Sequence, residues 1–179
     1  MDHIKQENQE VFYIDQPIIR IDDAKIQWLK DQAKSNGTGR SRFCVHRDMN
    51  DDMPHEMLIV HQNDVYVRPH KHIGKSESFH IIEGEVDIII FNDEGDIIDV
   101  VLMGERNVSG RCFFYRMCAE YYHSLIIRSD LLVFHETTRG PFVKEQTIYA
   151  SWSPVGYDLE ENEQYMQSLD KRCAAFLNK

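Results

Sequence analysis

The segment from Arg40 to Ser153 consists of short runs rich in Val, Ile, Phe and Tyr, separated by turn-forming residues. Nine such runs follow one another, among them SRFCVHR, HEMLIVHQ, ESFHIIEGEVDIIIF and LLVFHE. The breaks carry turn chemistry, for example NDEGD at 92–96 and RGP at 139–141. Turns at intervals of roughly 8 to 12 residues are typical of a β-sandwich or barrel. The sequence therefore predicts a mainly β domain.

Helical periodicity flanks this β region on both sides. Between residues 22 and 36, apolar residues recur at helical spacing, with Asp22 or Asp23 as N-cap and Gly37 as a stop. After Pro154, one apolar stripe contains Tyr165, Leu169, Cys173 and Phe176. We expect one structural domain with three parts: an N-terminal extension with a short helix (1–39), a β-barrel (40–154) and a C-terminal helix (155–179).

Composition and charge limit the partners. The formal net charge of −10 and the pI near 5.3 argue against binding to nucleic acid or anionic lipid, which needs clustered Lys and Arg. The first residues contain no apolar run of signal-peptide length, and no segment approaches the roughly 20 apolar residues of a membrane span. We expect a cytoplasmic protein that binds neither nucleic acid nor membrane. We also expect a homodimer, because edge strands of such barrels often pair between subunits.

The stretch RPHKHIGKSESFHIIEGE, at 68–85, concentrates metal-binding residue types. On a strand, side chains alternate between faces, so His70 and His72 point the same way and Lys71 points the opposite way. Gly74 lets the chain turn, after which Glu77 can return beside the two histidines. Imidazole nitrogens and a carboxylate oxygen suit a divalent transition metal. The alternative is that the histidines are solvated and that Glu77 pairs with Lys75.

The spacing H-x-H-x4-E-x6-G, formed by His70, His72, Glu77 and Gly84, resembles the first signature motif of the cupin superfamily. This resemblance implies a jelly-roll barrel, also called a double-stranded β-helix, with one bound Zn, Fe, Mn or Ni ion. It also implies a fourth ligand on a later strand, for which His123 is the candidate.

The second cupin motif carries P-x-G before its histidine and Asn after it, and RMCAEYYHSLII has neither. His80, His135 and Glu136 therefore remain alternatives to His123 as the fourth ligand. By strand parity His80 faces away from Glu77, and it is expected to be a buried, hydrogen-bonded histidine.

Several further runs are similar to the WbuC-type family of cupin-fold metalloproteins. Read in order, they include RFCVHR, HEMLIV, YYHSLI, VFHETTRGPF and YASWSP, and the resemblance covers most of the chain between about 40 and 154. It implies a small barrel with a bound metal and an association with bacterial surface-polysaccharide (O-antigen type) biosynthesis. It does not bring an established reaction.

Four other residues are candidates for contact with a ligand. Arg42 and His46 share a strand face, so Arg42 can hold an anionic or hydroxyl-rich ligand while His46 transfers a proton. Tyr66 aligns with His70 by strand alternation and is predicted to face the barrel interior as a second catalytic candidate. Lys75, in the loop between the metal-ligand candidates, is a second substrate-binding candidate.

Three functions are consistent with an open metal site. The first is a metal-dependent isomerase or epimerase that acts on a small-molecule sugar derivative such as a nucleotide sugar. The second is an Fe(II)-dependent dioxygenase, because a histidine-rich ferrous site with open positions supports O2 chemistry. The third is a non-enzymatic cupin that binds a small ligand and uses the metal as a structural element.

Overall fold

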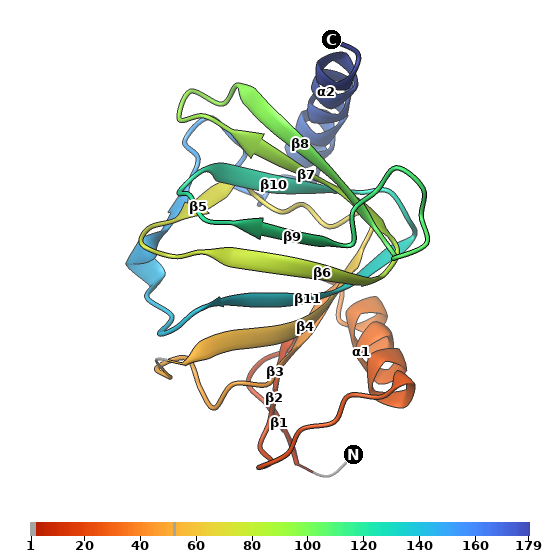
Figure 1. Cartoon of the computed structure of the whole chain (residues 1–179), viewed down its shortest axis with the longest axis vertical. Helices are drawn as coiled ribbons and strands as arrows, with labels where there is room; N and C mark the ends of the chain where they lie inside the picture. The colour runs from red at the N-terminus through yellow and green to blue at the C-terminus, as the bar shows by residue number, and fades with distance from the viewer. Residues whose placement is uncertain (1–2, 52) are drawn as a thin grey trace.

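The computed structural model describes residues 3–51 and 53–179 and contains two β-sheets packed face to face (Figure 1). Within these residues the first sheet has seven strands, in the spatial order β1 (Ile4–Gln6), β2 (Val11–Ile14), β3 (Arg40–Cys44), β4 (Pro54–Gln62), β11 (Leu131–Arg139), β6 (Glu77–Glu83) and β9 (Phe114–Met117). The second has five, in the order β12 (Thr147–Tyr149), β5 (His70–His72), β10 (Tyr122–Ile127), β7 (Glu85–Phe91) and β8 (Ile97–Gly104). The predicted mainly β class is confirmed.

Strand alternation divides each sheet into an inner and an outer face. On β7, Ile88 and Ile90 point into the main core between the sheets, whereas Ile89 and Phe91 belong to a second cluster on the outer face. The inner face of the first sheet supplies Phe79 and its neighbours to the same main core. Full burial of each such side chain stabilises the fold by about 1.5–3 kcal/mol, so the two sheets are held together by apolar packing.

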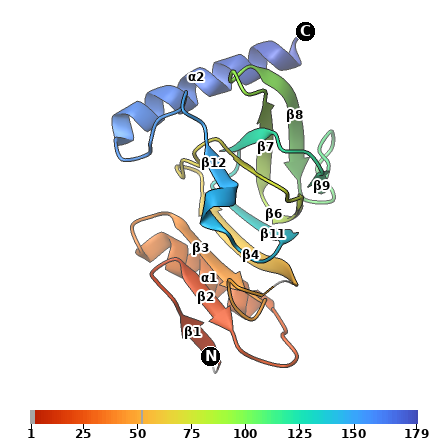
Figure 2. The ribbon, with the colours of Figure 1, turned by 90° about the vertical axis from the view of Figure 1, so that its left-hand side faces the viewer.

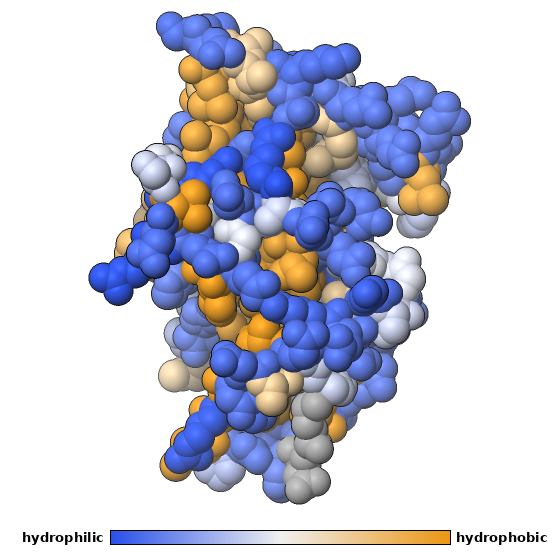
Figure 3. All heavy atoms as spheres, turned by 90° about the vertical axis from the view of Figure 1, so that its right-hand side faces the viewer, coloured by the Kyte–Doolittle hydropathy of each residue, from blue (hydrophilic) through white to orange (hydrophobic). Residues whose placement is uncertain are grey.

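Helix α1 (Asp23–Ser35) confirms the predicted N-terminal helix and covers the outer face of the first sheet. The side chain of Asp22 accepts a hydrogen bond from the backbone N–H of Lys25 at 3.0 Å, which caps the first turn. Leu29 is fully buried in the cluster beneath the helix. On the side of the molecule that carries α1, hydrophobic residues lie in separate patches within a hydrophilic surface (Figure 3).

The N-terminal segment also contributes strands that the sequence pattern did not predict. β1 pairs with β2, and β2 runs parallel to β3, so residues before α1 extend the first sheet. Both strands are short, at three and four residues, and lack the length on which a period-2 pattern becomes recognisable.

Helix α2 (Leu159–Leu177) covers the outer face of the second sheet, as the apolar stripe predicted (Figure 1). Asp158 caps its first turn by accepting hydrogen bonds from the N–H groups of Glu160 and Glu161. Leu169 and Cys173 are fully buried against the sheet. Within the described residues, neither helix is long and apolar enough to cross a membrane.

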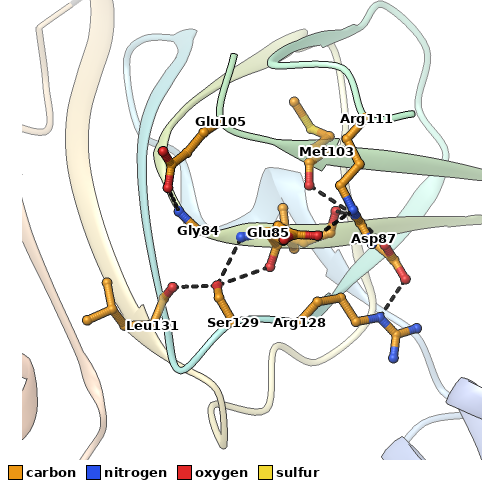
Figure 4. Close-up of polar contacts among 10 residues, drawn as sticks. Gly84, Glu85, Asp87, Met103, Glu105, Arg111, Arg128, Ser129 and Leu131 are labelled. Atoms are coloured by element: carbon orange, nitrogen blue, oxygen red, sulfur yellow. Dashed lines mark hydrogen bonds and ion pairs between the residues drawn. The ribbon is translucent and has the colours of Figure 1, made fainter. Parts of the chain in front are cut away.

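An ion-pair network ties α2 to the second sheet. Figure 4 shows the part of this network around Asp87. Asp87 on β7 is 2% exposed and accepts hydrogen bonds from Nη1 of Arg111 at 2.8 Å and Nε of Arg128 at 2.6 Å. Nη1 of Arg128 in turn lies 2.6 Å from a carboxylate oxygen of Asp170 on α2. The two guanidinium groups therefore compensate the cost of burying the Asp87 charge.

Gly84 forms the turn between β6 and β7 and requires glycine for two reasons. Its φ is +90°, in the region that side chains disfavour. A Cβ at this position would also clash with the carbonyl oxygen of Leu131 and with Oγ of Ser129, both of which adjoin the turn (Figure 4). This turn sends the chain from the first sheet to the second.

Candidate metal centre

Three histidines meet on the inner face of the second sheet. His70 and His72 lie on β5, where strand alternation points both side chains the same way. His123 on β10 is paired directly with His70, so its side chain leaves the sheet on the same side. The candidate ligand atoms of the three residues all lie within 4.8 Å of one another. The structure thus brings together three of the four predicted ligands from two neighbouring strands.

The remaining predicted ligand, Glu77, approaches from the opposite sheet. It is the first residue of β6, and its Oε1 lies 3.1 Å from Nε2 of His123. Its Oε2 lies 3.7 Å from Nε2 of His72. Glu77 is 3% exposed and His123 2% exposed. The Glu77 carboxyl group is therefore buried beside His123 and the partly exposed His72.

Backbone carbonyl groups determine which ring nitrogen is free in two of the histidines. Nδ1 of His70 donates to the carbonyl of Arg68 at 2.8 Å, and Nδ1 of His123 donates to the carbonyl of Tyr121 at 3.2 Å. A carbonyl group can only accept a hydrogen bond, so the neutral rings carry their proton on Nδ1. Nε2 of each ring then presents a lone pair to the interior, as metal-ligating histidines do.

The lone pair of His123 faces a carboxyl oxygen that has no hydrogen-bond donor. Oε1 of Glu77 is buried and is unsatisfied by the described residues, although Nε2 of His123 is 3.1 Å away. Two lone pairs at this distance repel each other unless a proton or a metal ion lies between them. Three imidazoles and one carboxylate are the donors that Zn, Fe, Mn and Ni accept, so the residues present fit such an ion.

Burial controls the protonation of the cluster. It lowers the pKa of His70 and His72 to about 3 and the pKa of His123 to about 4. For His70 and His72, the neighbouring histidines lower the pKa further. Burial raises the pKa of Glu77 to about 8. At neutral pH the histidines are therefore uncharged and ready to ligate, whereas the Glu77 carboxyl must lose a proton before it can do so.

The segment from η1 (Lys144–Gln146) into β12 crosses this end of the barrel (Figure 2). β12 pairs with β5 and sets Thr147 opposite His72 and Tyr149 opposite His70. Oγ1 of Thr147 lies 3.2 Å from Nδ1 of His72, and the ring centroids of Tyr149 and His70 are 5.9 Å apart. The run TIYASW indicates a strand but not the strand with which it pairs, so the sequence did not predict that Thr147 and Tyr149 lie beside the histidines.

Arg42 and His46 lie at the first sheet, whereas the three histidines lie on the second. Arg42 is exposed on β3, and His46, just beyond the end of this strand, stacks on His55 with ring centroids 3.9 Å apart. Strands β4 and β11 lie between β3 and β6, the strand that carries Glu77. Burial and the neighbouring His55 lower the pKa of His46. Proton transfer by His46 and ligand contact by Arg42 stay predictions.

The expected inward orientation of Tyr66 is wrong. Residues 65–69 have no strand structure and β5 begins only at His70, so the alternation does not extend back to Tyr66. The hydroxyl of Tyr66 donates to the carbonyl of Pro154 at 3.0 Å. Its ring packs edge-on against Tyr165 of α2, with centroids 6.0 Å apart. Tyr66 therefore packs with the helix outside the barrel, and we do not retain it as a catalytic candidate.

Lys75 lies in the loop between β5 and β6 and is half-buried. Its Nζ donates to the carbonyl of Pro141 at 2.6 Å and lies 6.0 Å from the centroid of the Phe142 ring. Burial and the charge of Arg139 lower its pKa. Its own charge contributes to the low pKa of His72, so the ammonium group is within electrostatic reach of the cluster. A contact between Lys75 and a substrate stays a prediction.

The alternatives to His123 divide between the two faces of the first sheet. His80 is exposed and lies near Phe113, so its expected burial is wrong: the outer face of β6 lies beyond the part of the sheet that α1 packs against. His135, directly opposite His80, lies on the same outer face, with Nε2 3.6 Å from Oε1 of Glu56. Glu136 has the opposite parity and faces inward.

Comparisons with known proteins identify the fold. The model of a domain of unknown function, DUF6016, matches residues 21–103, a little under half of the chain. No curated protein matches the sequence. Protein SO0799 from Shewanella oneidensis is similar in structure, with a TM-score of 0.54 at 10% identity over 67% of this chain and 82% of that one.

A second similar structure is CapF, a capsular polysaccharide assembling protein from Staphylococcus aureus. Its TM-score is 0.50 at 15% identity, and the match covers 74% of this chain. The chain spans about a third of the length of CapF, since the match covers 33% of that protein. CapF is a cupin-fold protein, and this likeness, together with the two-sheet architecture, shows that the chain has the cupin jelly-roll fold.

Proposed function

We propose that this chain binds one divalent transition metal through His70, His72, Glu77 and His123. The observation that carries this proposal is the convergence of three histidines, whose ligand atoms lie within 4.8 Å of one another, on the buried carboxyl group of Glu77, whose Oε1 lies 3.1 Å from Nε2 of His123. A metal ion bound there would supply Lewis acidity to the oxygen atoms of a ligand. The histidines would remain neutral, and Glu77 would release its proton.

For the ligand we propose a sugar or nucleotide sugar, and for the reaction an isomerisation or epimerisation. The chain resembles the WbuC-type family, which is associated with surface-polysaccharide biosynthesis. The name of CapF, which shares the fold, places that protein in capsular polysaccharide assembly. A sugar also offers the neighbouring carbonyl and hydroxyl oxygens that suit a metal with open positions. Together these points favour a step in bacterial surface-polysaccharide biosynthesis.

Elemental analysis of protein purified without added metal tests the first part of the proposal. We expect one transition metal near unit stoichiometry, retained after gel filtration. The second part is tested by incubating the metal-loaded protein in D2O with a panel of free and nucleotide-activated sugars. Nuclear magnetic resonance should detect deuterium at a carbon next to the carbonyl of at least one sugar.

The possible results separate the competing functions. Bound metal without deuterium incorporation or turnover across the panel would exclude sugar isomerisation. Oxygen uptake by protein loaded anaerobically with Fe(II) would then favour the dioxygenase. Failure to bind Zn, Fe, Mn or Ni after reconstitution would exclude the metal centre itself.

A further inference from the structure

Two ionisable side chains, those of Tyr115 and Glu136, lie on the inner face of the first sheet, one inward-facing position along the strands from Glu77. Phe79 lies two residues after Glu77 on β6 and points the same way, about 7 Å further along the strand. Phe79 pairs with Tyr115 of β9 on one side and with Glu136 of β11 on the other. Directly paired residues share a face, so Tyr115 and Glu136 lie on the inner wall on either side of the Phe79 ring.

The hydroxyl group of Tyr115 is buried without a partner. The ring packs on Phe79 with centroids 5.9 Å apart, and its oxygen forms no hydrogen bond with the described residues. Leaving such a group unsatisfied costs about 1–3 kcal/mol, so packing alone does not account for a tyrosine where phenylalanine would fit. Burial raises the pKa of Tyr115, and the charges of Glu77 and Asp99 raise it further. The hydroxyl group is therefore protonated in the resting protein and available as a donor.

Glu136 places a carboxyl group on an apolar stretch of the same wall. Its neighbours across the two flanking strands are Met57 and Phe79, both buried in the main core. Burial and the nearby Glu77 raise its pKa, whereas the charge of Arg42 lowers it. Glu136 is thus electrostatically linked both to a predicted metal ligand and to a predicted anion-binding residue. A carboxyl group that faces inward among apolar side chains is a candidate for proton transfer.

We propose that Glu136 and Tyr115 are the proton-transferring pair for a ligand held at the histidine cluster, with Glu136 as base and Tyr115 as donor. This inference rests on the proposed function and specifies its substrate as a sugar with a hydroxyl-bearing carbon next to a carbonyl. Both side chains act from the same wall, so the pair favours isomerisation over epimerisation, which needs proton delivery to opposite faces of one carbon.

The proposed step is balanced without any oxidant or reductant. Ionised Glu136, whose pKa is raised to about 8, takes the proton from the hydroxyl-bearing carbon. The C–H electron pair becomes a C=C bond, and the carbonyl oxygen takes the proton of Tyr115. The Tyr115 phenolate then takes the proton of the second hydroxyl group, whose oxygen becomes the new carbonyl. Glu136 returns its proton to the former carbonyl carbon, where the C=C electron pair forms the new C–H bond. Both side chains end in their starting states.

The test uses Glu136→Gln and Tyr115→Phe with two matched controls. Glu83→Gln changes a carboxylate at the far end of β6 that pairs with Lys30. Tyr165→Phe removes another buried, unpartnered hydroxyl group, but one that packs with the outer cluster beneath α2. Each protein is loaded with Co(II), its metal content is measured, and acetohydroxamate, a chelating mimic of the enediol, is titrated by visible absorption. Deuterium incorporation into the sugar panel is measured on the same variants.

We expect Glu136→Gln and Tyr115→Phe to keep their metal and to bind acetohydroxamate about ten-fold more weakly, the loss of one hydrogen bond to a polar ligand. Both should lose deuterium incorporation, and the two controls should match the parent. The proposed pair would be wrong if the variants bound acetohydroxamate as tightly as the parent or if either variant lost its metal. It would also be wrong if the parent did not bind acetohydroxamate. If acetohydroxamate binding weakens as expected but no sugar exchanges deuterium in the parent, the pair stands and the sugar function fails.

Discussion

Nε2 of His123 and Oε1 of Glu77 lie 3.1 Å apart although their strands belong to different sheets. The backbone carbonyl of Tyr121 holds the proton of His123 on Nδ1, so the facing nitrogen is an acceptor like the carboxylate oxygen. In the metal-free protein the proton of Glu77 stabilises the contact, and a metal ion that displaced this proton would also engage His70 and His72. This pair therefore links the two walls of the barrel at the candidate site.

Single substitutions in the cluster should abolish metal retention. We expect His70→Ala, Glu77→Gln and His123→Ala each to weaken metal affinity by at least about 100-fold, because each removes a direct ligand. His80→Ala is the matched control, since His80 lies on the same sheet as Glu77 but is exposed on its outer face. Elemental analysis after gel filtration checks this. Retention of metal by all three variants would show that it binds elsewhere.

Metal binding should release a proton. Burial raises the pKa of Glu77 to about 8, so at pH 7 the metal-free protein holds a proton that the metal displaces. We expect release of about one proton per metal at pH 7, and an apparent affinity that falls about ten-fold per pH unit as the pH drops below about 8. Calorimetric titration in buffers of different ionisation enthalpy measures this. Heats that do not depend on the buffer would contradict it.

Gly84→Ala should be far more damaging than Gly74→Ala. Both glycines have positive φ, +90° and +71°, but only the Cβ at position 84 meets other atoms, those of Leu131 and Ser129. We expect Gly84→Ala to lower the free energy of unfolding by about 3 kcal/mol or more and Gly74→Ala by about 1 kcal/mol. Urea denaturation of metal-free protein compares them. Equal effects would mean that the turn relaxes around the added methyl group.

Asp87→Ala should destabilise the fold without affecting the metal. The substitution leaves Arg111 and Arg128 without their buried partner, and we expect a loss of about 3 kcal/mol in the free energy of unfolding. Asp93→Ala, which removes an ion pair between Lys71 and an exposed carboxylate, should change stability by less than about 0.5 kcal/mol. Denaturation curves and metal content of both variants check this. A similar stability for the two would show that the network contributes little.

The local features of the chain were predictable because they depend on neighbouring residues. The N-cap and apolar spacing of α1 and the stripe of α2 followed from helical periodicity. The common direction of His70 and His72 followed from alternation on one strand. Alternation failed at Tyr66, where residues 65–69 leave the strand conformation and the period of two no longer applies.

The mainly β class, the flanking helices and a set of candidate ligands therefore follow from the order of the residues alone. Which of these residues meet depends on the folded arrangement, because strand pairing joins segments that are far apart in the chain. It set His123 opposite His70, brought Glu77 from the other sheet, and left His80 exposed on the outer face, not buried. It also placed Tyr115 and Glu136 on either side of Phe79. No periodicity within a single strand specifies these partners, since register is a property of the whole barrel.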